Sequence, residues 1–148
     1  MEIEMTDILK SIFCYGFHDT DINSITIKDD EIIIYFSDGL YTLDSEKNEN
    51  KLLHNLRMIV KTKIFHKGTD ATDNINVWDS RYGDVDTIDF LNKLLTSQFG
   101  IDNLYYSPFN STILIDGFYN NESNFEKGIS QKIIILIENC LSVQYYVN

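Results

Sequence analysis

The sequence has few of the features that mark secreted, membrane-spanning or nucleotide-dependent proteins. Its 148 residues include two cysteines and one proline, and no apolar run approaches the roughly 20 residues that a membrane-spanning helix needs. It contains no glycine-rich phosphate-binding loop, which excludes the common nucleotide-dependent classes. The opening MEIEMTDILK is acidic where a secretory signal would be basic. We therefore expect a single soluble domain, residues 1–148, in a reducing, cytoplasmic compartment and without a membrane partner.

Basic residues are also scarce. The chain has 12 Lys and Arg against 23 Asp and Glu, which gives a net charge of −11. A field of this sign repels nucleic acid and anionic membranes and attracts basic partners. The charges are segregated, since residues 51–69 carry five bases and no acid, whereas residues 70–126 carry ten acids and two bases. We therefore expect a basic protein partner and no direct binding of nucleic acid.

Apolar residues make up 43% of the chain and aromatic residues 13%, enough for a core in one domain. Runs rich in β-branched and aromatic residues, with turn residues between them, indicate strands. The expected strands are residues 24–28, 31–36, 40–43, 56–66, 74–78, 104–106, 112–118, 131–138 and 141–147. Residues 32–36 in EIIIYF and 133–137 in KIIILIE are continuously apolar, which predicts that both faces of these two strands are covered.

Two helices are predicted, a short N-terminal one at about residues 6–14 and a main one at about 87–98. Apolar residues of the main helix fall on one stripe: Ile88, Leu91, Leu95 and Phe99, with Leu94 beside them. The sum predicts an α+β fold, in which a curved antiparallel β-sheet of about 6–8 strands carries one main helix and a short N-terminal helix.

The stretch HDTD, residues 18–21, is a candidate for a metal or catalytic site. His18 could act as a base oriented by Asp19 or Asp21, and the two carboxylates could bind magnesium or calcium together with a distant acid such as Asp38. The stretch matches no established metal-binding loop, and no nucleophile motif accompanies it. We favour a structural interpretation, in which the aspartates accept hydrogen bonds from the backbone of a turn. A metal-assisted hydrolase using His18, Asp19 and Asp21 is the alternative.

The acidic segment DATDNINVWDSRYGDVDTID, residues 70–89, interleaves carboxylates with two aromatic residues. Aromatic anchors beside exposed acids suit binding to a basic protein, because the aromatics supply buried area and the acids speed the encounter. The other interpretation is a polar loop with Trp78 in the core. The candidate partner-binding residues are Asp70, Asp73, Trp78, Asp79, Tyr82, Asp84 and Asp86.

A family resemblance begins at residue 16, in GFHDTDINSITIKDDEIIIYFSDGLY. The pattern is an aromatic, then His-Asp, two further residues, an isoleucine, a strand, a short turn and a second strand that ends before Asp-Gly. It resembles the opening of small bacterial proteins that are similar to immunity proteins of contact-dependent growth inhibition and related polymorphic toxin systems. The residues that carry the resemblance are Phe17, His18, Asp19, Ile22, Ile25, Ile27, Asp38 and Gly39.

The resemblance implies a protein that binds and neutralises a toxin domain inside the cell. Many such toxins are nucleases with basic clefts, which an acidic inhibitor can occupy by mimicking the substrate's charge. We therefore expect a monomeric, non-enzymatic binding protein that needs no cofactor or metal and has a cognate toxin as its partner. A structural domain that oligomerises through an exposed sheet edge is a further alternative.

Overall fold

Antiparallel strands dominate the fold. The computed structural model describes residues 2–5, 15–18, 20–36, 38–43, 46, 48–120 and 132–147. These residues form three antiparallel sheets and one main helix, which confirms the predicted fold class. The N-terminal helix predicted at residues 6–14 lies outside the described residues.

The strands belong to sheets of five, six and three strands. The five-stranded sheet contains, in spatial order, β1 (Glu2–Met5), β14 (Cys140–Val147), β8 (Leu56–Thr62), β5 (Glu31–Phe36) and β4 (Ser24–Lys28). The six-stranded sheet contains β10 (Gly83–Val85), β9 (Ile75–Asp79), β13 (Ile133–Ile137), β12 (Thr112–Tyr119), β11 (Phe99–Ser107) and β3 (Asp21–Ile22). The small sheet contains β2 (Tyr15–Gly16), β6 (Leu40–Leu43) and β7 (Glu49–Leu53).

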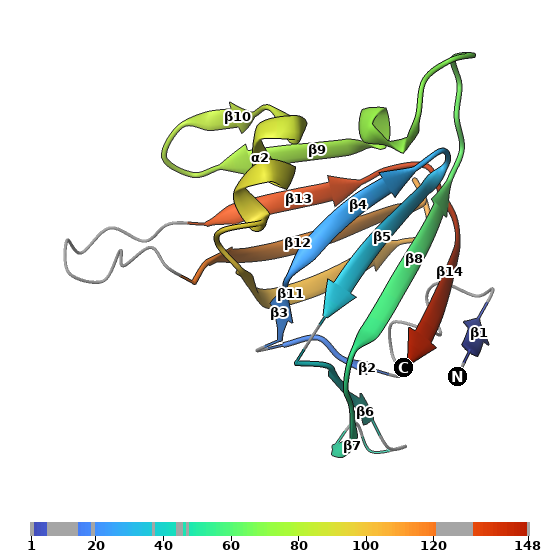
Figure 1. The fold of residues 1–148 in the computed structure, drawn as a ribbon, viewed down its shortest axis with the longest axis vertical. Coiled ribbons are helices and arrows are strands. Elements are labelled where there is room, and N and C mark those ends of the chain that lie inside the picture. The colour runs from blue at the N-terminus through green and yellow to red at the C-terminus, as the bar shows by residue number, and fades with distance from the viewer. Residues whose placement is uncertain are drawn as a thin grey trace.

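The two large sheets form two layers with the core between them. Figure 1 shows β4, β5, β8 and β14 lying in front of β13, β12 and β11. Alternate residues of both sheets are fully buried, such as Ile32 and Ile34 of β5 and Ile133 and Ile135 of β13. The chain passes from one layer to the other at β3–β4, at β8–β9 and at β13–β14, so both sheets contribute to one core.

The main helix, α2 (Thr87–Leu94), contacts β4, an edge strand of the five-stranded sheet, and β9, the second strand of the six-stranded sheet. The Asp86 carboxylate caps its N-terminus by accepting a hydrogen bond from the Asp89 N–H at 3.1 Å. Phe90 is 1% exposed, and its ring lies 6.2 Å from that of Phe99 and 6.1 Å from that of Tyr119. The helix therefore helps to close the core between the two layers. Neither α2 nor the 3-10 turn η1 (Ala71–Asn74), the helices of the described residues, is long and apolar enough to cross a membrane.

Most predicted strands are found, and several match residue for residue. The strands predicted at 24–28, 31–36 and 40–43 are β4, β5 and β6. The strand predicted at 56–66 ends earlier, at Thr62, where the backbone N–H and hydroxyl of Thr62 both donate to the Asp30 carbonyl, at 2.8 and 3.0 Å. The strand predicted at 104–106 is the longer β11.

Three sequence-based details are wrong. The main helix ends at Leu94, so Leu95 lies beyond its last turn, and Phe99 opens β11. The buried helix face is formed by Phe90 and Leu94, while Ile88 is 51% exposed. The strands β5 and β13 are also not covered on both faces, because their burial alternates between full and partial. Only their inner faces lie in the core.

Candidate functional site

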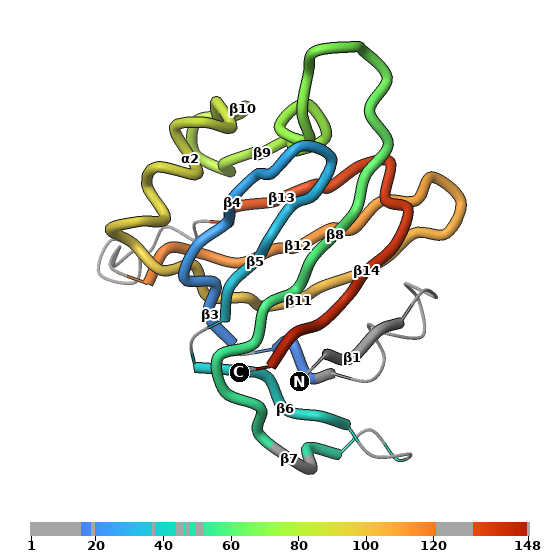
Figure 2. The backbone as a smooth tube through the Cα atoms, turned by 45° about the vertical axis from the view of Figure 1, so that its right-hand side comes forward, coloured from blue at the N-terminus to red at the C-terminus, as the bar shows by residue number. Residues whose placement is uncertain are grey.

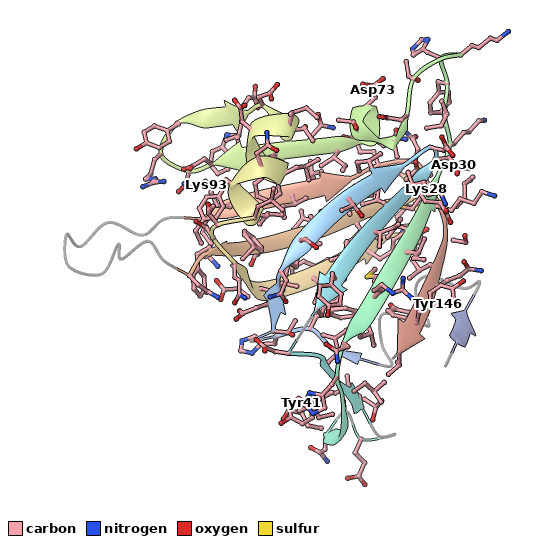
Figure 3. The ribbon with its side chains drawn as sticks, viewed as in Figure 1. Lys28, Asp30, Tyr41, Asp73, Lys93 and Tyr146 are labelled. Carbon is pink, nitrogen blue, oxygen red and sulfur yellow. The ribbon has the colours of Figure 1, made fainter. Side chains whose placement is uncertain are left out.

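The acidic segment begins with η1, which displays two carboxylates at one end of β9. Asp70 caps η1 by accepting a hydrogen bond from the Thr72 N–H at 2.9 Å. Hydrogen bonding from Thr72 lowers the pKa of Asp70 below its ordinary value. Asp73 is exposed in the same turn, and both aspartates line a cavity of about 220 Å³ together with Phe65 and His66. Figure 3 shows Asp73 near the end of the molecule opposite Tyr41.

The β9–β10 hairpin carries the aromatic residues of the segment. Trp78 is 42% exposed and pairs across the strands with Asp84, so the two side chains lie on the same face. Tyr82, in the turn, is 76% exposed, with the Arg81 guanidinium 4.7 Å from its ring centre. The interpretation that places Trp78 in the core is therefore wrong. The hairpin presents Trp78 and Tyr82 to solvent beside a carboxylate.

Asp79 has a different position from the other predicted contact residues. It is 4% exposed, and its carboxylate accepts a hydrogen bond from the Arg81 N–H at 2.8 Å and from the Arg81 side chain at 3.4 Å. The carboxylate therefore fixes the hairpin turn from inside the fold. Asp79 is excluded from direct contact with a partner in this structure because solvent barely reaches it.

The exposed members of the predicted set form two groups. Asp84 and Asp86 lie at the hairpin and at the start of α2, and the exposed Asp89 follows in the first helical turn. Asp70 and Asp73 lie beyond the opposite end of β9. A five-residue strand spans about 17 Å. The hairpin group, with its two aromatics, is therefore the denser candidate for a contact surface.

The HDTD stretch is built around Thr20. Thr20 is 8% exposed, its hydroxyl donates to the Gly39 carbonyl at 2.7 Å, and its own carbonyl accepts from the Ile101 N–H at 2.8 Å. Asp21 pairs with Gly100 in the sheet, and His18 is exposed. The stretch therefore links the small turn at Gly39 to β11. Asp19 lies outside the described residues.

A cavity of about 250 Å³ adjoins this stretch. Its lining includes polar and aromatic side chains from three parts of the chain: His18, Asp21, Asp38, Tyr41 and Glu49. In the part of the chain that the structure describes, no three His, Cys, Asp or Glu side chains are arranged to hold a metal ion. The chemistry of the cavity suits a cationic or hydrogen-bonding group more than an anion.

Sequence reasoning missed the far side of the six-stranded sheet. Register places Trp78 opposite Ile134 and Ile134 opposite Asp116, while Leu136 lies opposite Leu114. Residues directly opposite each other in an antiparallel sheet share a face. The sequence KIIILIE shows that β13 has apolar side chains on both faces. It does not show which strands lie beside β13 in the sheet. Trp78 therefore belongs to an apolar surface that extends well beyond the acidic segment.

Comparisons with protein-family models, with curated proteins and with solved structures gave no match.

Proposed function

We propose that this chain is a toxin-neutralising immunity protein, which binds a cognate basic toxin domain in the cytoplasm and blocks its activity. A nuclease is the expected class of toxin. The observation that carries the proposal is the exposed pair of Trp78 and Asp84 on the β9–β10 hairpin, with the exposed Tyr82 in the adjoining turn. The resemblance of residues 16–43 to immunity proteins supports the same class.

The chemistry of the hairpin suits a basic partner. Indole and phenol rings are frequent anchors of protein interfaces because they bury a large area at a low entropy cost. Exposed carboxylates accelerate the approach of a cationic surface and disfavour anionic competitors. With a net charge of −11, the whole chain adds to this steering. Binding over a nuclease cleft would place these acids where substrate phosphates bind.

The test begins with the protein encoded by the neighbouring open reading frame, since immunity genes directly follow their toxin genes. We expect the two purified proteins to form a one-to-one complex, and expression of this chain to protect cells from the neighbouring product. A chain that neither binds that product nor protects cells from it is not its immunity protein.

Charge variants then test the contact surface. Replacing Asp84 and Asp86 with asparagine should slow association several-fold at low salt, because two steering charges are lost. The asparagine at position 86 still caps α2, so stability should be kept. A matched control removes two exposed charges from the opposite end, by Asp38→Asn with Glu49→Gln. Surface plasmon resonance should show that the control pair changes the association rate little. At about 1 M salt, where screening acts within roughly 3 Å, the two double variants should associate at the same rate.

The alternative of a metal-assisted hydrolase would use the cavity that His18 and Asp21 line with Asp38 and Glu49. Under this alternative the purified protein should contain a divalent metal by elemental analysis. Added metal should also raise the melting temperature of the original chain but not of the His18→Ala variant. A metal-free protein with no metal-dependent shift would remove the alternative.

A further inference from the structure

The side of the six-stranded sheet that faces away from the core carries several large apolar side chains among polar ones. We call it the outer face and define it by six side chains that adjacent strands place together: Trp78, Leu114, Phe118, Tyr105, Ile134 and Leu136. Trp78 is 42% and Tyr105 56% exposed, and Phe118 is 36% exposed. The two β13 residues and Leu114 are half-buried. Four adjacent strands thus contribute apolar side chains to this face, with Asp116 between Leu114 and Phe118 and Asn76 beside Leu136.

No described helix or sheet covers this surface. Figures 1 and 2 show the five-stranded sheet and α2 on the other side, where Phe90 packs against Phe99 and Tyr119. Antiparallel sheets with one solvated face ordinarily alternate apolar residues inside with polar residues outside. Here β13 keeps isoleucine and leucine on both faces. An exposed apolar patch rimmed by polar residues marks an interaction site more often than a solvated surface.

The charges around the outer face are mainly negative. Asp84 lies beside Trp78, and Glu138 accepts a hydrogen bond from the Asn76 amide at 2.8 Å. Asp102 and Asp116 share the ammonium group of Lys132, which lies 3.5 Å from Asp116. Among the described residues at this face, four carboxylates therefore accompany one lysine. This balance opposes an anionic partner, including a second copy of this acidic chain, and complements arginine and lysine side chains.

We propose that the outer face is the docking surface for a basic protein, whose apolar side chains cover Trp78, Leu136 and Tyr105 while its cationic side chains approach the surrounding carboxylates. The inference rests on the proposed function and deepens it, because it assigns the toxin contact to the sheet face as well as to the acidic hairpin. Leu136 and Tyr105 become contact residues that lie far outside the acidic segment in sequence.

Trp78 offers a direct readout because it is the only tryptophan in the chain. Labelling the full chain with 5-fluorotryptophan gives one ¹⁹F resonance, and the purified product of the neighbouring gene is the titrant. We expect this resonance to shift as the complex forms. Tyr105→Ala and Leu136→Ala should each weaken binding at least tenfold, since truncated interface anchors have effects of that size. The matched control is Leu141→Ala, because Leu141 is 55% exposed but belongs to β14 of the other large sheet.

Circular dichroism melting first establishes that each variant folds like the original chain. The inference is overturned if a complex forms but the ¹⁹F resonance does not shift and Tyr105→Ala and Leu136→Ala bind as tightly as the original chain. That result leaves the proposed function standing. Absence of any complex removes both. Light scattering tests whether a second copy of this chain binds the outer face instead. A mass of two chains for the original protein and of one chain for the Tyr105→Lys variant would assign the outer face to self-association and overturn the inference.

Discussion

Removal of the Phe90 side chain is the sharpest test of how α2 is docked. Phe90 is 1% exposed and lies in ring contact with Phe99 and Tyr119. Truncating a buried phenylalanine to alanine typically costs about 3–5 kcal/mol, since the transfer free energy is lost and a cavity remains. We expect Phe90→Ala to lower the free energy of unfolding by about 4 kcal/mol. With a urea dependence of about 2 kcal/mol per molar, the midpoint should fall by about 2 M.

The control variant lies on the same helix. Ile88 belongs to the stripe that the sequence predicts as buried, yet it is 51% exposed. Because little area is lost and alanine is the better helix former, Ile88→Ala should cost less than about 1 kcal/mol. Urea unfolding of both variants, followed by circular dichroism, measures the difference. A larger loss in Ile88→Ala than in Phe90→Ala would refute the docking of α2 described above.

Three further predictions concern stability. Gly39 and Gly83 both have φ near +85°, but an added Cβ at Gly39 would lie 1.8 Å from the Leu53 carbonyl oxygen, whereas one at Gly83 would meet open space. In urea unfolding, Gly83→Ala should lower the free energy of unfolding by about 1–2 kcal/mol, and Gly39→Ala should lower it clearly more. Equal losses in the two variants would contradict the clash at Gly39. Asp86→Ala should cost about 1 kcal/mol because the cap of α2 is lost, whereas Asp86→Asn should be nearly neutral in the same assay. Burial raises the pKa of the Cys140 thiol from 9.0 to about 11, so the folded state binds its proton more tightly than the unfolded state. This contribution is complete below pH 9 and is lost between about pH 9 and 11, by up to about 3 kcal/mol. Cys140→Ala should lack this part of the pH dependence of stability, and identical pH profiles of the two proteins would exclude the effect.

The strands were predictable because their signal is local. Runs of β-branched and aromatic residues between turn residues located β4, β5 and β6 without knowledge of their neighbours. The buried face of α2 was not predictable in the same way. Both Ile88 and Phe90 are apolar, and which of them is buried depends on the position of Phe99, a residue of the six-stranded sheet. Tertiary packing therefore decided what helical periodicity left open.

The candidate site shows the same limit. Composition and the pairing of acids with aromatics identified the hairpin that exposes Trp78 and Tyr82. The burial of Asp79 followed from a hydrogen bond to the turn at Arg81, a contact that sequence spacing does not distinguish from exposure. The outer face joins residues from β9, β11, β12 and β13 through a strand order that is not the chain order. Such a surface exists only in the folded molecule.

The pairing of β1 with β14 has a consequence for the order of events during synthesis. Residues 2–5 pair with residues 143–146, and β8 lies between β5 and β14. At about 5–20 residues per second, β14 is completed roughly 4–17 s after β8. Until then one edge of β8 has no strand to pair with, and unpaired edges promote aggregation. The newly made chain therefore passes several seconds in which a chaperone, or a second nascent copy, competes with its own final strand.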